Sequence, residues 1–221
     1  PPGGLVGGDR LEIGVQVGAQ AHALITTPGA TKFYRSAGPR TDQVQRLSVA
    51  SGGVLEWLPQ ENILFAGANL RLSTSLELAP GAGFLGWEVH CLGRPVIAER
   101  FATGQADLGL GVHRGGVPLL VERLRVEGPE SLDGPSGLRG FPVTGSLVAT
   151  GADSADLAAA RAHQCMDPAV LWGATLLGDL LIARALAPRT EAMRRLFAAL
   201  WGILRPRLLG RPACPPRIWA T

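Results

Sequence analysis

The sequence contains one lysine, Lys32, and the rest of its basic charge is carried by arginine. The formal net charge is +3 at pH 7, and the arginines are scattered among acidic residues instead of forming a basic run. Nucleic-acid-binding chains usually carry a basic run, or basic residues interleaved with aromatic ones. The composition therefore argues against nucleic acid as a partner and favours pairs between arginine and carboxylate side chains.

Cysteine is also scarce. Cys91, Cys165 and Cys214 form an odd set without C-x-x-C spacing. No signal-peptide pattern opens the sequence either. We therefore expect a reducing, cytoplasmic environment for this chain.

Long apolar runs are missing. The longest candidate, residues 171–186, is interrupted by two glycines and Asp179, and it carries Arg184. Because a membrane-spanning helix needs about 20 mostly apolar residues, this run is too short and too polar to cross a bilayer. We expect no membrane-spanning segment in this sequence.

Catalytic motifs are absent as well. The sequence has no G-x-S-x-G nucleophile elbow, no H-E-x-x-H zinc motif and no dinucleotide-binding fingerprint. Ser36, His90 and either Asp9 or Asp107 supply the residue types of a triad, so a hydrolase stays as a remote alternative. The sequence favours a protein that is not an enzyme.

A glycine-rich stretch at residues 3–9 invites comparison with a phosphate-binding loop. The spacing G-x-x-x-x-G-K-[ST] is not present, and no lysine follows that could reach a phosphate. These glycines are more typical of tight turns between strands. Asp9 at the end of the stretch is a carboxylate that we keep as a candidate site residue.

What the sequence has in abundance is turn residues, with 30 glycines and 17 prolines, and short alternating apolar runs. Residues 10–27 alternate as a pair of half-buried strands around Gly18. Similar strand-like runs separated by turns lie at residues 44–49, 54–58, 69–78, 84–92, 108–112 and 119–126. This pattern predicts a mainly β fold with stacked or sandwiched sheets that form an extended β body.

The pattern changes after a loop predicted at residues 128–140. A strand at 146–150 is followed by a helix over 157–166 capped by Asp153 or Ser154, and a second helix starts at Thr190 and is stopped by Pro206. Residues 174–187 fit either a hairpin or a helix by periodicity alone. We expect one domain over residues 1–221, with the β body in 1–140 and a small α+β part with two helices in 141–221.

Several glutamates lie in apolar, strand-like surroundings where an unpaired charge is costly. They are Glu56, Glu61, Glu88, Glu99 and Glu122. Two explanations stay open. The carboxylates pair with Arg35, Arg94, Arg100 or Arg123, or they line a wet passage that attracts a divalent cation.

Several blocks of the sequence, taken in order, identify a family. They include Leu55-Glu56-Trp57-Leu58-Pro59-Gln60-Glu61, Gly86-Trp87-Glu88-Val89-His90-Cys91-Leu92-Gly93-Arg94-Pro95 and Pro216-Arg217-Ile218-Trp219. With residues 2–9 and 26–36, they make the chain resemble the UreD (also UreH) family of urease accessory proteins. The resemblance implies that the family's amino-terminal strands are missing before Pro1.

The resemblance implies a cytosolic scaffold for urease maturation. Such a scaffold would join a UreF-type protein, itself bound to the GTPase UreG, and dock on apo-urease during nickel insertion. The resemblance also implies a hairpin at residues 174–187 and a water-filled passage as the route for nickel. It implies no tightly bound cofactor, only transient Ni²⁺.

Four carboxylates are the candidate residues of this passage: Glu61, Glu88, Glu122 and Asp9. Isolated carboxylates with water exchange Ni²⁺ readily, whereas imidazole and thiolate hold it strongly. The four histidines are not paired at ligand spacing, and adjacent His90 and Cys91 should point to opposite faces of a strand. Passage therefore fits better than storage, and a scaffold without an ion passage stays as the alternative.

Three residues are candidates for contacts with partner proteins. Tyr34, Arg35 and Arg94 belong to residue types that supply much of the binding energy at protein interfaces. Trp87 and Trp219 are equally consistent with an interface and with core packing.

Overall fold

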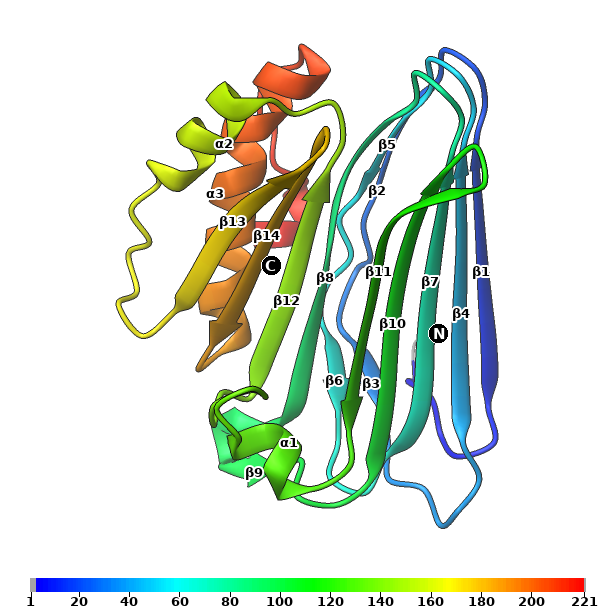
Figure 1. Ribbon diagram of the computed structural model, residues 1–221. Coiled ribbons are helices and arrows are strands. Elements are labelled where there is room, and N and C mark those ends of the chain that lie inside the picture. The colour runs from blue at the N-terminus through cyan, green and yellow to red at the C-terminus, as the bar shows by residue number, and fades with distance from the viewer. Residues whose placement is uncertain (1–2, 221) are drawn as a thin grey trace.

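The computed structural model describes residues 3–220 and has three layers (Figure 1). A five-stranded sheet forms one outer layer, a nine-stranded sheet forms the middle layer, and helices cover the far face of the middle sheet. The mainly β architecture predicted from the sequence is confirmed.

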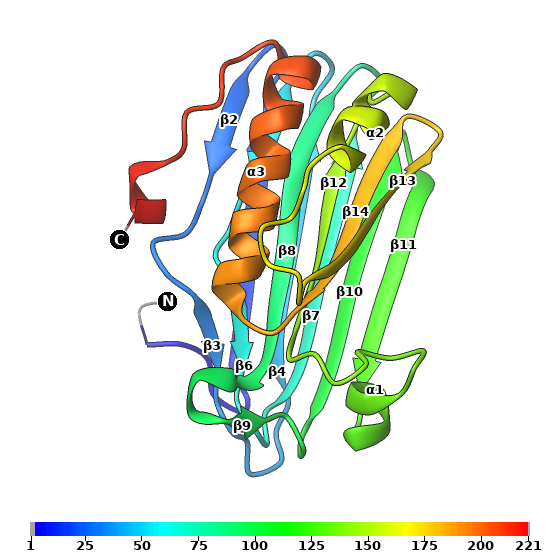
Figure 2. The ribbon, with the colours of Figure 1, turned by 90° about the vertical axis from the view of Figure 1, so that its left-hand side faces the viewer.

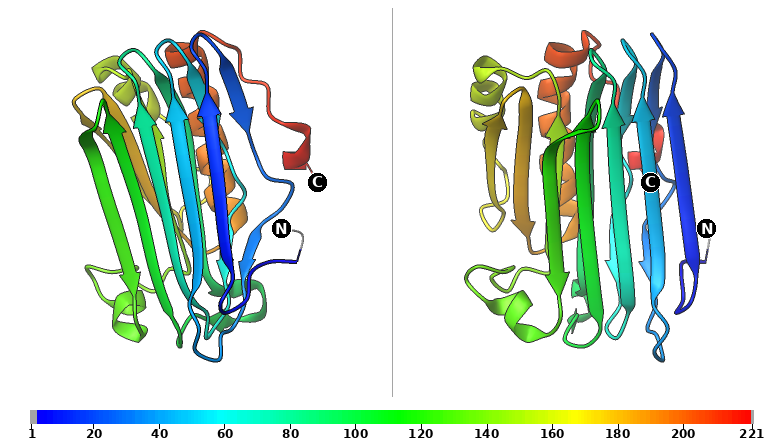
Figure 3. Two further views of the ribbon diagram at one scale, coloured as in Figure 1. Left: turned by 90° about the vertical axis from the view of Figure 1, so that its right-hand side faces the viewer. Right: turned by 45° about the vertical axis from the view of Figure 1, so that its right-hand side comes forward.

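The five-stranded sheet is the more regular of the two, and Figure 3 shows it nearly face on. Its strands in spatial order are β1 (Arg10–Val17), β4 (Thr41–Val49), β7 (Asn69–Leu78), β10 (Gln105–Arg114) and β11 (Val117–Val126). The first four are parallel and β11 is antiparallel to β10. In β4, every second residue is buried, as expected for a sheet with one solvent-exposed face.

The nine-stranded sheet is built around the long strand β8. Its main path is β13 (Leu171–Leu177), β14 (Leu180–Ala187), β12 (Val143–Ala149), β8 (Gly83–Arg94), β5 (Val54–Trp57) and β2 (His22–Ile25). Further along β8, β6 (Asn62–Leu64) takes the place of β5, β3 (Thr31–Phe33) pairs with β6, and β9 (Glu99–Arg100) joins the end. The sheet is therefore interrupted at residues 58–61, between β5 and β6.

The chain winds back and forth between the two sheets, which explains their parallel pairing. β1 lies in one sheet, β2 and β3 in the other, β4 again in the first, and this alternation continues to β10. The prediction of a strand pair around Gly18 was thus wrong in one respect. Both strands form, but they lie in different sheets, because alternation marks a half-buried strand without specifying its neighbour.

Within residues 3–220, three α-helices and two short 3-10 turns complete the fold: α1 (Pro129–Asp133), α2 (Ser154–Arg161), α3 (Thr190–Leu209), η1 (Pro95–Ile97) and η2 (Arg217–Ala220). Asp153 caps α2 by accepting hydrogen bonds from the backbone N–H groups of Ala155 and Asp156. The hairpin of β13 and β14 turns at Gly178, as the resemblance implied. Figure 2 shows α3 lying along the middle sheet with α2 beside it.

Three boundaries differ from the predictions. Helix α1 lies inside the segment predicted as loop, and α2 ends at Arg161 instead of continuing to residue 166. Pro206 does not stop α3, which continues to Leu209 and is terminated by Gly210 with φ of 63°. A proline so near the helix end removes only the hydrogen bond to the carbonyl of Gly202, four residues earlier, so the helix tolerates it.

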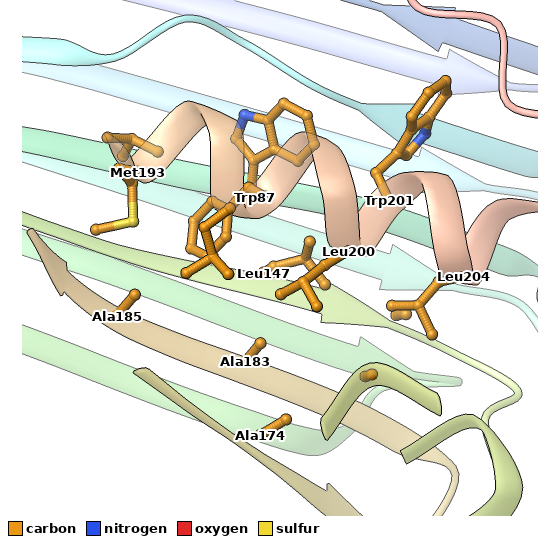
Figure 4. Packing of buried hydrophobic residues seen from close by; sticks show 14 of the residues in the cluster. Trp87, Leu147, Ala174, Ala183, Ala185, Met193, Leu200, Trp201 and Leu204 are labelled. Atoms are coloured by element: carbon orange, nitrogen blue, oxygen red, sulfur yellow. The ribbon is translucent and has the colours of Figure 1, made fainter. Parts of the chain in front are cut away.

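Both faces of β8 are covered, which gives the molecule separate apolar cores. Trp87 and Val89 point to the helices, where they join Leu200 and Trp201 of α3 in one cluster (Figure 4). Two further clusters lie between the sheets, one around Leu76 and Trp57 and the other around Leu70 and Phe33. Polar residues lie between these last two clusters.

Candidate functional site

A layer of polar side chains crosses the space between the two sheets. In the five-stranded sheet, Gln45, Thr74 and Glu122 occupy one row of paired residues, with Leu110 between the last two. In the middle sheet, Glu88, Ser146 and Arg184 occupy a facing row. We call the full set the polar layer: Gln43, Gln45, Asn62, Thr74, Glu88, His90, Glu122, Ser146 and Arg184.

The centre of the polar layer is the contact between Thr74 and Glu88. Thr74 Oγ1 lies 3.0 Å from Gln45 Oε1 and is also in hydrogen-bond contact with Glu88 Oε1. A hydroxyl has one proton, so Thr74 cannot donate to both acceptors. When Glu88 is ionised it accepts from Thr74, and when it is protonated it can donate to Thr74 while Thr74 donates to Gln45.

Burial gives Glu88 and His90 unusual protonation behaviour. Burial raises the pKa of Glu88 to about 7, against the opposing effect of the Thr74 hydrogen bond, and the charge of Glu122 raises it further. Burial lowers the pKa of His90 to about 4, so its imidazole is neutral at pH 7. His90 Nδ1 lies 3.4 Å from Asn62 Nδ2, and His90 Nε2 lies 3.8 Å from Glu88 Oε2.

The polar layer reaches the surface between β11 and β14. There Arg184 forms an ion pair with Glu122, and Ser146 Oγ donates to Glu122 Oε2 at 3.1 Å. A cavity of about 660 Å³ is lined by these residues together with Glu88 and His90. Side-chain exposure falls from 52% at Arg184 through 22% at Glu122 to 9% at Glu88, so the acidic residues lead inward from the surface.

The four predicted passage residues do not all meet. Glu88 and Glu122 are brought together in the polar layer. Asp9 lies in the first turn, where its Oδ2 accepts a hydrogen bond from the backbone N–H of Val6 at 2.9 Å, and it does not line the cavity.

Glu61 lies at the interruption of the middle sheet. Its backbone carbonyl accepts from Thr31 N–H at 3.0 Å, and its Oε2 is buried without a hydrogen-bond partner in the described part of the chain. Asn62 contacts His90 in the polar layer, so alternation directs Glu61 toward the helices. Burial, followed by the charges of Glu61 and Glu191, raises the pKa of Cys91 to about 12.

The other two glutamates of this set, one half-buried and one fully buried, are paired. Glu99 pairs with Arg94, as one of the two explanations anticipated. Glu56, which is fully buried, binds Arg205 of α3 at 2.9 Å and also accepts from Trp201 Nε1 at 2.7 Å. Among the described residues, Arg94 is the one arginine of the four named from the sequence that pairs with any of these five glutamates. Glu56 and Glu122 pair instead with Arg205 and Arg184, which are distant from them in the sequence.

Two of the predicted partner-binding residues share a neighbour that the sequence analysis missed. The Tyr34 and Phe65 rings pack edge to face, with their centres 4.8 Å apart. The guanidinium carbon of Arg94 lies 4.4 Å from the centre of the Phe65 ring. Arg35 lines a separate shallow pocket with Ser36 and other residues of that end of the sandwich. Trp87 belongs to the core, and the Trp219 ring packs against the Trp87 ring with their centres 5.4 Å apart.

Sequence reasoning also missed Gln45, Thr74, Ser146 and Arg184. A signal for one of them was present, since Thr74 occupies an inward position in a strand whose other inward residues are all leucines. Across residues 3–220, no three His, Cys, Asp or Glu side chains are grouped closely enough to hold a metal ion. Over the same span, no helix is long and apolar enough to cross a membrane.

Comparisons with known proteins agree over the whole length of the chain. A family model described as UreD urease accessory protein matches residues 1–220. A urease accessory protein UreD from Alcanivorax borkumensis is 47% identical over 224 residues, which cover 100% of this chain and 76% of that protein. Proteins of the same name from Pseudomonas entomophila and Azoarcus sp. are 47% and 48% identical, and each match covers 100% of this chain and 78% of the relative.

Proposed function

The chain belongs to the UreD family of urease accessory proteins, and we propose that it passes nickel through its polar layer while linking a UreF/UreG-type complex to apo-urease. The observation that carries this proposal is the inward path from Glu122 to Glu88 between the two sheets. In this role nickel is cargo, and the protein supplies its route.

The chemistry of the polar layer suits transfer. Carboxylate, amide and hydroxyl oxygens are hard, weak ligands that exchange a divalent cation with water. Because the pKa of Glu88 is about 7, an arriving cation can displace its proton near neutral pH. Gln43 Oε1, which is buried without a partner among the described residues, supplies another oxygen beyond Gln45.

A scaffold without an ion passage is the main alternative. In that case the polar layer would only fix the register of the two sheets. Glu88 argues against so limited a role, because no arginine pairs with it in the described part of the chain and its raised pKa costs roughly 3 kcal/mol of stability above pH 7. A neutral residue would fix the register without this cost.

We further propose that the chain has no catalytic turnover. The residues considered for a triad lie apart: the Ser36 hydroxyl donates to the Pro39 carbonyl, whereas His90 lies in the polar layer against Asn62 and Glu88. Neither Ser36 nor Asp9 contacts His90 among the residues described.

The proposed function is tested by gene deletion and complementation. In the deletant we expect urease to be synthesised with little nickel, and the intact gene should restore the nickel content. The tagged protein should copurify with the UreF-type partner and apo-urease. Normal nickel content in the deletant would refute the proposal.

A further inference from the structure

A second cavity, of about 330 Å³, lies on the helical side of the molecule. Its walls come from the first half of α3 and from Trp219 in η2, and its floor comes from Trp87 and the interrupted segment between β5 and β6. Figure 2 shows the last residues of the chain, in red, on the same side as α3. The two indoles give the cavity an apolar wall, and Arg194 and Arg195 give it a charged one.

The cavity is lined by two arginines and one glutamate, Glu191, and the carboxy-terminal segment that supplies them is rich in arginine. Residues 189–221 contain seven arginines and one glutamate, a formal charge of +6, so the preceding 188 residues carry −3 of the total of +3. Two of these arginines are neutralised, Arg205 by Glu56 and Arg207 by Asp156. The others have no carboxylate partner in residues 3–220: Arg189, Arg194, Arg195, Arg211 and Arg217.

Arg194 is held in place with part of its hydrogen-bonding capacity unused. Its Nη1 donates to Gln60 Oε1 at 3.0 Å, which fixes the guanidinium at the cavity. Its Nε is buried without an acceptor among the described residues. Its Nη2 has no hydrogen-bond partner among the described residues and is not buried, so a carboxylate in the cavity would bind there with a charge-assisted hydrogen bond.

We propose that this cavity is the docking site for an acidic segment of a partner protein. An aromatic or branched apolar side chain of that segment would pack against Trp87 and Trp219, and its carboxylates would pair with Arg194 and Arg195. The inference rests on the proposed function only in assuming a protein partner, and it does not require the ion passage.

The apolar wall favours a peptide over a simple anion or a nucleic acid. A free phosphate would pair with the arginines but leave the exposed part of the Trp219 indole uncovered. Tryptophan and arginine side chains around one pocket are instead typical of a protein-binding hot spot. The excess positive charge would also speed the approach of an acidic partner.

The test measures the binding of a fluorescent synthetic peptide with one phenylalanine among aspartates and glutamates, by anisotropy, to the full chain. We expect Arg194→Gln to weaken binding about tenfold, the loss of one charge-assisted contact. Ala198→Leu, which fills the cavity from α3, should weaken it similarly. Arg211→Gln, an exposed and unpaired arginine beyond the end of α3, is the matched control and should bind within about twofold of the native chain.

Several results would overturn the proposal. One is an equal loss of peptide affinity in Arg211→Gln and Arg194→Gln. Another is that a peptide whose phenylalanine is replaced by serine binds the native chain as tightly as the original peptide. Tighter binding of single-stranded DNA than of the peptide, full competition by inorganic phosphate, or no binding to the native chain would overturn it as well. Near-ultraviolet circular dichroism checks that each variant is folded. Glu88→Gln should bind the peptide normally, so failure of the ion passage and failure of the docking site remain distinguishable.

Discussion

Thr74 of β7 and Glu88 of β8 are in hydrogen-bond contact across the space between the two sheets, midway between two apolar clusters. Glu88 lies near a protonation change at neutral pH because it is buried. A buried carboxyl that is neutral until a cation arrives can admit positive charge without a permanent anion in the interior. This relationship makes Glu88 the residue on which the ion passage is most directly tested.

Glu88→Gln should lower the nickel content of urease while leaving the complex with the UreF-type partner intact. Glutamine keeps the size and the contact with Thr74 but cannot become an anion. The measurement compares urease nickel with copurified partner, and Glu127→Gln, an exposed acid, serves as the control. Full activation by Glu88→Gln would show that no charge is required there, and joint loss of nickel and partner would favour a purely structural role.

The pH dependence of stability should reveal opposing contributions from Glu88 and His90. Folding raises the pKa of Glu88 from 4.5, its value in the unfolded chain, to about 7. The contribution of this group to stability is therefore complete below pH 4.5 and is lost as the pH rises through 7. The lowered pKa of His90 acts oppositely, with stability present above 6.5 and lost as the pH falls toward 4. Between pH 4.5 and 6.5 the two slopes, each about 1.4 kcal/mol per pH unit, cancel in the native chain.

Replacing Glu88 by glutamine removes one of these slopes. The unfolding free energy of the variant should exceed that of the native chain by roughly 3 kcal/mol at pH 8, and this difference should vanish near pH 4.5. Urea unfolding followed by tryptophan fluorescence across this range measures the difference. If the two proteins keep a constant difference in unfolding free energy, Glu88 does not titrate in this range.

Much of the fold could be predicted because its signals are local. β7 has the bounds expected from its alternation and from the Ala79-Pro80-Gly81 turn that follows it. Alternation could not show that β1 and β2 lie in different sheets, because that choice depends on packing between distant segments. In the site, Glu88 and Glu122 could be selected as costly charges in apolar strands, but their partners Thr74 and Arg184 follow only from the register of the sheets.

Arg205→Met should destabilise the protein by about 3–5 kcal/mol, because it leaves the fully buried Glu56 without its guanidinium partner. Arg207→Met is the matched control on the same helix. Arg207 pairs with Asp156 but is 41% exposed, so its loss should cost about 1 kcal/mol or less. Denaturant midpoints of the two variants measure the contrast, and adding Glu56→Gln to Arg205→Met should recover part of the loss. Equal costs would mean that the buried pair contributes no more than a surface one.

Gly145→Ala should disturb both the fold and the ion passage, because this glycine of β12 lies directly against Phe197 of α3. An added Cβ would lie 2.8 Å from Phe197 Cε2 and 2.9 Å from the backbone carbonyl oxygen of Glu88. Relieving those contacts requires a shift of α3 or of β8, and a shift of β8 moves the Glu88 carboxyl. We expect a loss of about 1–3 kcal/mol in unfolding free energy and a lower nickel content of urease.

Gly173 provides the matched control for that substitution, since it is also a strand glycine of the middle sheet. An added Cβ at Gly173 meets nothing within 4 Å, and its φ lies outside the left-handed region. Gly173→Ala should therefore leave stability unchanged or raise it by up to about 1 kcal/mol, by restricting the unfolded chain. If Gly145→Ala were equally harmless, the close approach of α3 to β12 would not constrain the position of Glu88, and the helical layer would not help to set the geometry of the passage.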